Sequence, residues 1–115
     1  MTSPVMSAFS ESRKRGDIGL IFPGFVKAQF FVLGERTSPM VIEPLLAKSP
    51  TPKRLCITVS ETREALARAG THALLEMSGR EILRAFGHRY DVIVTYGGGG
   101  DLLTIEQMEW FASNP

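Results

Sequence analysis

The residues best suited to bind a ligand are four consecutive glycines at 97–100 and the following Asp101. They lie between a strand predicted at 92–96 and a helix start predicted at Thr104. Glycines after a strand let backbone N–H groups approach a phosphate, and a nearby helix start adds a favourable dipole. However, Leu102 stands where a dinucleotide fingerprint has its third glycine, and no Gly-Lys-Ser/Thr follows. We therefore favour a flexible turn and keep a small-molecule or nucleotide-phosphate site as the alternative, at Gly97, Gly98, Gly99, Gly100 and Asp101.

Residues that could act in catalysis are few and stand apart. His72 and His88 are the two histidines, and neither has a spacing to a cysteine or an acid that suits a metal. Cys56 lies within an apolar run whose buried face the pattern leaves open. On a core face, Cys56 would behave as a small hydrophobic residue with a raised pKa. Because no nucleophile has an identifiable base, the sequence predicts no catalytic residue, no metal, no cofactor and no enzymatic activity.

Composition limits the class of molecule. The chain has 115 residues, of which 43% are apolar and 22% charged, which is typical of one globular domain. A formal net charge of +1 provides no overall field for nucleic acid or an anionic membrane, and the basic run 13–15 lacks interleaved aromatic residues. A single cysteine fits a reducing compartment, and no apolar run approaches the roughly 18 residues of a membrane span. We expect a cytoplasmic protein that binds neither nucleic acid nor membrane.

The chain divides into a tail and one domain. Residues 1–16 are polar and show no apolar period, which predicts a flexible N-terminal tail before a single domain at 17–115. Pro23 suits the first turn of a short helix. The apolar run 29–33 then predicts a strand that ends at Gly34.

The later half of the chain alternates strands with helix starts. Five apolar runs of the whole chain predict strands, at 29–33, 40–42, 55–59, 73–77 and 92–96. Ser78 with Glu81 and Thr104 with Gln107 form capping boxes, and Ser60 can cap a further helix. We predict an α+β fold, with a mixed β-sheet of about five strands and short helices packed mainly on one face.

Five stretches between residues 22 and 112 share their pattern with a known bacterial family, at 29–35, 54–61, 77–83, 92–100 and 103–108. Within them, one strand leads into Ser60 and Glu61, and a helix begins at Ser78. This pattern resembles the SseB-type domain, although that family often has Asn-Pro-Gly where this chain has Tyr96 and two glycines. The resemblance implies an α+β domain without established enzymatic activity. It also implies links, by family name, to serine sensitivity and, by gene neighbourhood, to secretion or toxin immunity.

Large aromatic residues are more numerous than the predicted helix and strand near the N-terminus need for a core. The predicted partner surface consists of Phe22, Phe25, Phe30, Phe31 and Trp110. Apolar side chains left outside the core form patches that usually mark a partner surface. We therefore predict a protein-interaction domain whose partner is another protein or a second copy in a homodimer. A toxin-immunity protein that uses exposed acids such as Glu61, Glu76 and Asp101 is a further alternative.

Overall fold

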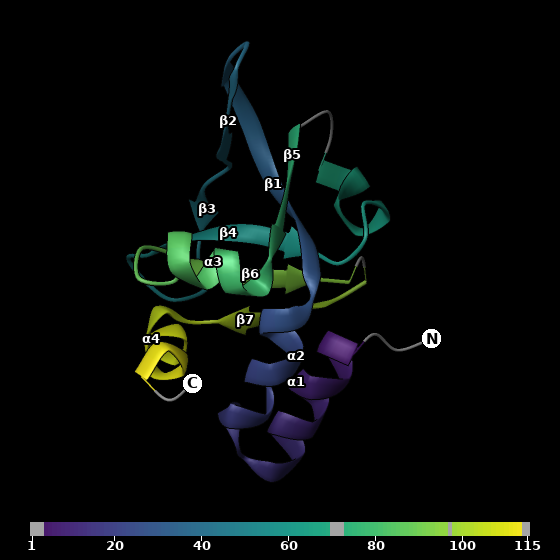
Figure 1. Ribbon diagram of the computed structural model, residues 1–115, viewed down its shortest axis with the longest axis vertical. Coiled ribbons are helices and arrows are strands. Elements are labelled where there is room, and N and C mark those ends of the chain that lie inside the picture. Colours follow the sequence, from purple (N-terminus) through teal and green to yellow (C-terminus); the bar gives the residue numbers. More distant parts are fainter. Residues whose placement is uncertain (1–3, 70–72, 97, 114–115) are drawn as a thin grey trace.

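The computed structural model describes residues 4–69, 73–96 and 98–113. Figure 1 shows how their helices and strands are arranged. The helices are α1 (Pro4–Arg15), α2 (Phe22–Lys27), α3 (Gly79–Phe86) and α4 (Ile105–Ser113), with the 3₁₀-helices η1 (Ile18–Leu20) and η2 (Glu64–Ala69). The strands are β1 (Gln29–Ser38), β2 (Val41–Pro44), β3 (Ala47–Lys48), β4 (Leu55–Ser60), β5 (Ala73–Ser78), β6 (Asp91–Thr95) and β7 (Gly100–Leu103). The fold is α+β, as the sequence predicts.

The strands form one mixed sheet. Its order is β2-β1-β4-β6-β7, and outside that path β5 pairs with β1 and β3 pairs with β4. β4 and β6 run parallel, whereas the other strand pairs of the described residues are antiparallel. Phe31 and Val32 pair with both β4 and β5, so these two strands lie on opposite edges of β1. With seven strands in the described part of the chain, the sheet is larger than predicted, and β1 continues past Gly34.

β7 is the strand that the sequence did not predict. The backbone N–H of Tyr96 donates to the carbonyl oxygen of Gly99 at 2.9 Å, which closes a hairpin turn. The chain then returns along β6 and pairs Leu103 with Val92, both of which are fully buried. The predicted turn from a strand directly into a helix is therefore wrong, because the glycines join two antiparallel strands and α4 begins only after β7.

The core lies on one face of the sheet. Alternate residues of four strands point to this face and are buried, namely Phe30, Val32, Ile57, Val59, Val92, Val94 and Leu103. The α-helices add buried side chains to the same cluster, namely Val5, Phe9, Phe25, Ile82, Met108 and Phe111. The four α-helices of the described chain therefore pack mainly on one face, as predicted.

Helix α1 occupies the stretch predicted to be a flexible tail. Val5 and Phe9 are 0% and 4% exposed, and together with Ser12 they recur four and three residues apart, which places them on one helix face. Figure 1 shows α1 beside α2, and the two helices are in contact. The tail prediction is wrong because a stripe this narrow does not stand out from the polar residues around it.

Both predicted capping boxes are present. At α3, the backbone N–H of Glu81 donates to Ser78 Oγ at 3.1 Å, and the Ser78 N–H donates to Glu81 Oε1 at 3.0 Å. The hydrogen bond from the Ser78 backbone, followed by that with its side chain, lowers the pKa of Glu81. At α4, the N–H of Gln107 donates to Thr104 Oγ1 at 3.2 Å, and the Thr104 N–H donates to Gln107 Oε1 at 2.9 Å. Ser60 instead ends β4, and the next helix is the later 3₁₀-helix η2.

We expect Ser78→Ala to lower the free energy of unfolding by about 1 kcal/mol, because the first turn of α3 loses its cap. Urea denaturation of the purified protein measures this loss. Ser7→Ala, at an exposed position of α1, is the matched control and should change stability by less than about 0.5 kcal/mol. Equal effects at the two serines would show that α3 does not depend on its cap.

Candidate functional site

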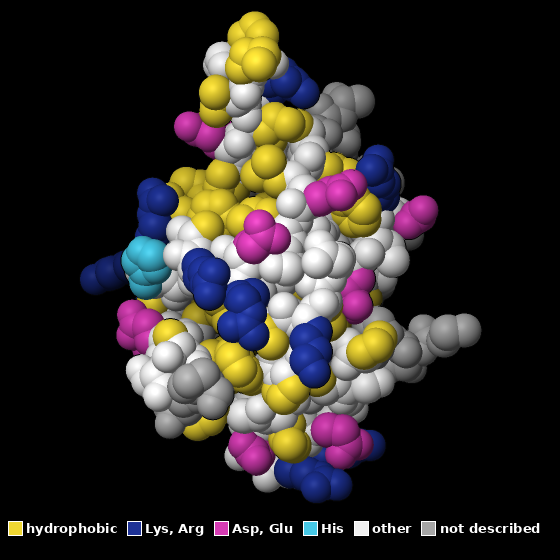
Figure 2. All heavy atoms as spheres, viewed as in Figure 1, with side chains coloured by type: hydrophobic (Ala, Val, Ile, Leu, Met, Phe, Trp, Pro, Cys, Tyr) yellow, Lys and Arg dark blue, Asp and Glu magenta, His cyan; other side chains and the backbone are white. Residues whose placement is uncertain are grey.

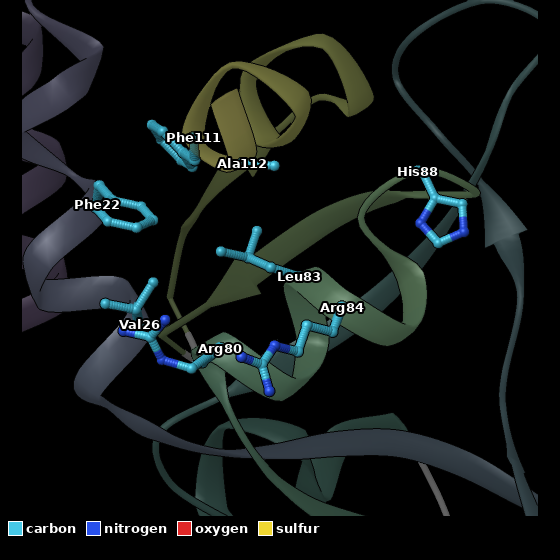
Figure 3. A pocket seen from close by; sticks show the side chains of 8 residues that line it. All are labelled: Phe22, Val26, Arg80, Leu83, Arg84, His88, Phe111 and Ala112. Carbon is cyan, nitrogen blue, oxygen red and sulfur yellow. The ribbon is translucent and has the colours of Figure 1, made fainter. Parts of the chain in front are cut away.

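An apolar groove lies between helices α2, α3 and α4, and we call it the helical groove. It has a volume of about 380 Å³. Its lining consists of Phe22, Val26, Arg80, Leu83, Arg84, His88, Phe111 and Ala112. Figure 3 shows that Leu83 points from α3 into the space between α2 and α4.

The floor of the helical groove is aromatic and aliphatic. The rings of Phe22 and Phe111 lie 5.4 Å apart between centroids, tilted by 47°. Phe22 and Val26 are four residues apart on α2 and therefore face the same way. On α3, burial of Ile82 in the core directs the next residue, Leu83, into the groove. The floor is thus held by helices whose other faces are fixed in the core.

The rim of the helical groove is basic. Arg80 and Arg84 stand four residues apart on α3, and His88 follows four residues later, just after the helix. In Figure 3 the two arginines extend from the same helix at the edge of the groove. Within the described residues, no carboxylate lines the groove, and neither arginine forms an ion pair. The groove is therefore suited to an apolar group that carries a negative charge beside it.

The structure divides the predicted partner surface. Phe22 lines the groove, and Trp110, 42% exposed, packs edge-on against Phe111 with ring centroids 5.8 Å apart. Phe25 and Phe30 are 0% and 1% exposed and stack 5.0 Å apart in the core. Their assignment to an exposed surface is therefore wrong, because the space between α2 and β1 needs both rings to fill it.

Phe31 lies on the opposite face of the sheet from the groove. The guanidinium carbon of Arg63 is 4.8 Å from the centroid of its ring, and Arg63 also forms an ion pair with Glu76 at 3.4 Å. Phe31 is half-buried and Glu76 is exposed. These two residues are therefore neighbours across the strand pair β1–β5, but they do not join Phe22.

Sequence reasoning missed the residues of α3 and α4 that complete the helical groove. A signal was present, because Arg80, Arg84 and His88 recur at intervals of four residues. That spacing places basic groups on one helix face, which is the ordinary pattern of a solvated surface. Only the packing of α3 against α2 places Phe22 beside them.

The predicted glycine site is the tip of the β6–β7 hairpin. Gly98, Gly99 and Gly100 are exposed, and Gly97 lies outside the described residues. Because β7 separates this turn from α4, the helix dipole does not act at the turn as the sequence interpretation required. The turn has a structural role in reversing the chain.

Asp101, the acidic member of the predicted glycine site, makes two contacts to protein groups. Its Oδ2 accepts a hydrogen bond from the hydroxyl group of Tyr96 at 2.7 Å, and its Oδ1 forms an ion pair with Arg13 of α1. Burial raises the pKa of Tyr96, and the hydrogen bond to Asp101 raises it further. Asp101 therefore joins α1 to the edge strand β7.

Cys56 and Asp91 form a buried polar pair on the sheet face opposite the core. They are register partners on β4 and β6, and both are 0% exposed. Burial, followed by the charge of Asp91, raises the pKa of the Cys56 thiol, whose Sγ lies 3.7 Å from the carbonyl oxygen of Lys48. The thiol is therefore protonated and enclosed. His88 lies instead at the helical groove, and His72 is outside the described residues.

The Asp91 carboxylate is fully engaged by the protein. It accepts hydrogen bonds from Ser49 Oγ at 2.6 Å, the backbone N–H of Ile105 at 2.9 Å and Arg54 at 3.4 Å. Arg54 also forms a two-point contact with Glu106. This network ties the loop before β4 to the start of α4. In the described chain, no group of three or more His, Cys, Asp or Glu residues lies close enough together to hold a metal ion.

Comparisons of the chain with protein-family models, curated proteins and solved structures found no match. The resemblance to the SseB-type domain therefore stays a prediction. No helix of the described residues combines the length and the apolar character needed to span a membrane. The functional argument consequently depends on the geometry of the helical groove.

Proposed function

We propose that this protein is a non-enzymatic cytoplasmic interaction domain, of the SseB-like type, that binds a protein segment in the helical groove. The observation that supports the proposal is the combination of an apolar floor, in which Phe22 and Leu83 are partly exposed, with a rim of arginines that form no ion pair among the described residues. Apolar pockets with a few polar groups at their edge are the common form of a binding site.

The construction of the groove favours a binding role. Phe22, Leu83 and Phe111 come from three helices, and each helix is anchored by a buried residue, so the floor is formed before a partner arrives. A preformed site loses little conformational entropy on binding. Aromatic and arginine side chains are also the types that contribute most at protein interfaces.

The distribution of polar groups favours a protein segment over a small metabolite. A small ligand is usually oriented by polar groups that converge on one point. Here Arg80, Arg84 and His88 instead form a row along one side, while the floor is apolar. A row of this kind suits an extended or helical segment that places an apolar side chain in the floor and acidic groups along the rim.

A photo-crosslinking experiment tests the proposal. Ala112, which lines the groove, is replaced by p-benzoylphenylalanine in cells that make this protein, and Ser7 on α1 is replaced in a matched control. Irradiation is expected to yield a discrete protein adduct from position 112 and none from position 7. A second variant carries the same crosslinker at Arg84, on the rim of the groove. The proposal is overturned if neither position 112 nor position 84 yields a protein adduct while both variants remain folded by circular dichroism.

A further inference from the structure

The β1–β2 hairpin ends in exposed apolar residues. Met40 is 91% exposed and Val41 is 44% exposed. Figure 1 shows that this hairpin projects from the rest of the molecule at one end of its longest axis. A methionine at a projecting tip can enter a partner's cavity without any change in its own fold, and its thioether makes favourable contacts with aromatic rings.

The same hairpin carries two carboxylates side by side. Glu35 of β1 and Glu43 of β2 are register partners, and both are exposed. Like charges directly opposite each other on neighbouring strands are unfavourable. Among the described residues, neither glutamate forms an ion pair. The hairpin therefore presents an apolar tip with two carboxylates behind it that form no ion pair within the described chain, while Arg36 donates a hydrogen bond to the carbonyl oxygen of Pro39 at the tip.

The helical groove presents the complementary arrangement. Its apolar floor suits the Met40 side chain, and its unpaired Arg80 and Arg84 suit carboxylates such as Glu35 and Glu43. The two glutamates lie on the β1–β2 hairpin and the two arginines on α3, so the opposite charges are on separate elements of one molecule. Opposite charges of this kind attract and orient two copies of a protein.

We propose that the occupant of the helical groove is the tip of the β1–β2 hairpin of a second copy of this chain. This inference rests on the proposed function and names the partner. Met40 of one copy lies against the partly exposed Phe22 and Leu83 of the other, and the hairpin glutamates pair with the arginines of α3.

Both surfaces are visible from the same side of the molecule. Figure 2 shows basic side chains over α3 and apolar side chains at the hairpin end on the same face of the molecule. In the proposed dimer, a twofold rotation relates the two copies, so each hairpin meets the other copy's groove and the assembly is closed. Because each contact is small, the dimer should be a weak one with a micromolar dissociation constant.

Sedimentation equilibrium over a range of protein concentrations tests the inference. The wild-type chain is expected to show a monomer–dimer equilibrium. Met40→Asp is expected to remove the dimer without affecting folding, because the side chain is almost fully exposed. Arg84→Glu and Glu43→Arg should each weaken the dimer about tenfold or more. Lys48→Glu and Glu64→Arg, exposed charge reversals outside both surfaces, are the matched controls and should leave it unchanged.

An equimolar mixture of Arg84→Glu and Glu43→Arg gives the sharpest outcome. In the mixed dimer, the reversed hairpin meets the reversed groove and the wild-type hairpin meets the wild-type groove, so dimerisation is expected to return. A wild-type chain that stays monomeric, or a mixture that stays as weak as its components, overturns the inference. If crosslinking at Ala112 then still captures a different protein, the proposed function stands and only the identity of the partner is wrong.

Discussion

Gly79→Ala is expected to prevent folding or to lower the free energy of unfolding by more than about 4 kcal/mol. A Cβ added to Gly79 would lie 1.7 Å from the carbonyl oxygen of Phe25 and 2.6 Å from its carbonyl carbon. These are backbone atoms of α2, so they cannot rotate out of the way. Separating the helices would also break the hydrogen bond from the Gly79 N–H to Ala28, 3.0 Å long. Because α2 and α3 form two walls of the helical groove, the substitution should abolish binding as well.

The same substitution at Gly24 is the matched control. A Cβ there would lie 3.5 Å from the Cβ of Ala8, which is ordinary van der Waals contact. Gly24 lies within α2, where alanine is favoured over glycine by up to about 1 kcal/mol, so Gly24→Ala should be neutral or stabilising. Chemical denaturation followed by the fluorescence of Trp110, the single tryptophan, compares the two variants. Equal stabilities would mean that α2 and α3 do not approach as closely as the structure shows.

Asp91→Ala is expected to lower the free energy of unfolding by about 3 kcal/mol at neutral pH. The substitution removes the acceptor of hydrogen bonds from Ser49 and the Ile105 backbone, and it leaves these part-buried donors without that acceptor. Because Ile105 begins α4, the loss also loosens the helix that places Phe111 in the helical groove. Guanidinium denaturation measures the change. Asp17→Ala, at an exposed carboxylate that caps η1, should cost about 1 kcal/mol or less.

The effect of Asp91→Ala should depend on pH. Burial alone raises the pKa of Asp91, but hydrogen bonds from Ser49, the Ile105 backbone and Thr51, with the charge of Arg54, outweigh it and hold the pKa below its ordinary value. A carboxyl group with a lowered pKa in the folded chain contributes stability above its unfolded pKa, and this is lost as pH falls through the folded pKa. The difference in stability between wild type and Asp91→Ala should therefore be widest near neutral pH and narrow below about pH 4. A constant difference between about pH 7 and about pH 3 would contradict this assignment.

Predictions from sequence succeeded where the cause lies within a few residues. The cap at Ser78 needs only Glu81 three residues later, and the cap at Thr104 needs only Gln107, so their signals are complete in the local sequence. Pro23 likewise lies in the first turn of α2, as its restricted backbone favours. Strands β4 and β6 were predicted because their buried residues form short apolar runs.

Prediction failed where a distant partner decides the outcome. The four residues of β7 begin with a glycine and an aspartate, and they form a strand because Leu103 and its neighbours pair with β6. Val5 and Phe9 make α1 a structured helix because they bury their side chains in a core assembled from strands and helices far along the chain. In neither case do the local residues show which distant segment of the chain packs against them.

The sequence by itself determined the α+β class, the capped helix starts and the absence of a recognisable pairing of nucleophile and base, because each depends on residue type and short spacing. Only the tertiary structure decided which aromatic side chains are available. Phe25 and Phe30 fill the space between α2 and the sheet, whereas Phe22 remains at the groove beside Arg80 and Arg84. The physical reason is that burial depends on what packs against a side chain, and contacts such as Phe22 with Phe111 and Phe25 with Gly79 join residues about 50 to 90 positions apart.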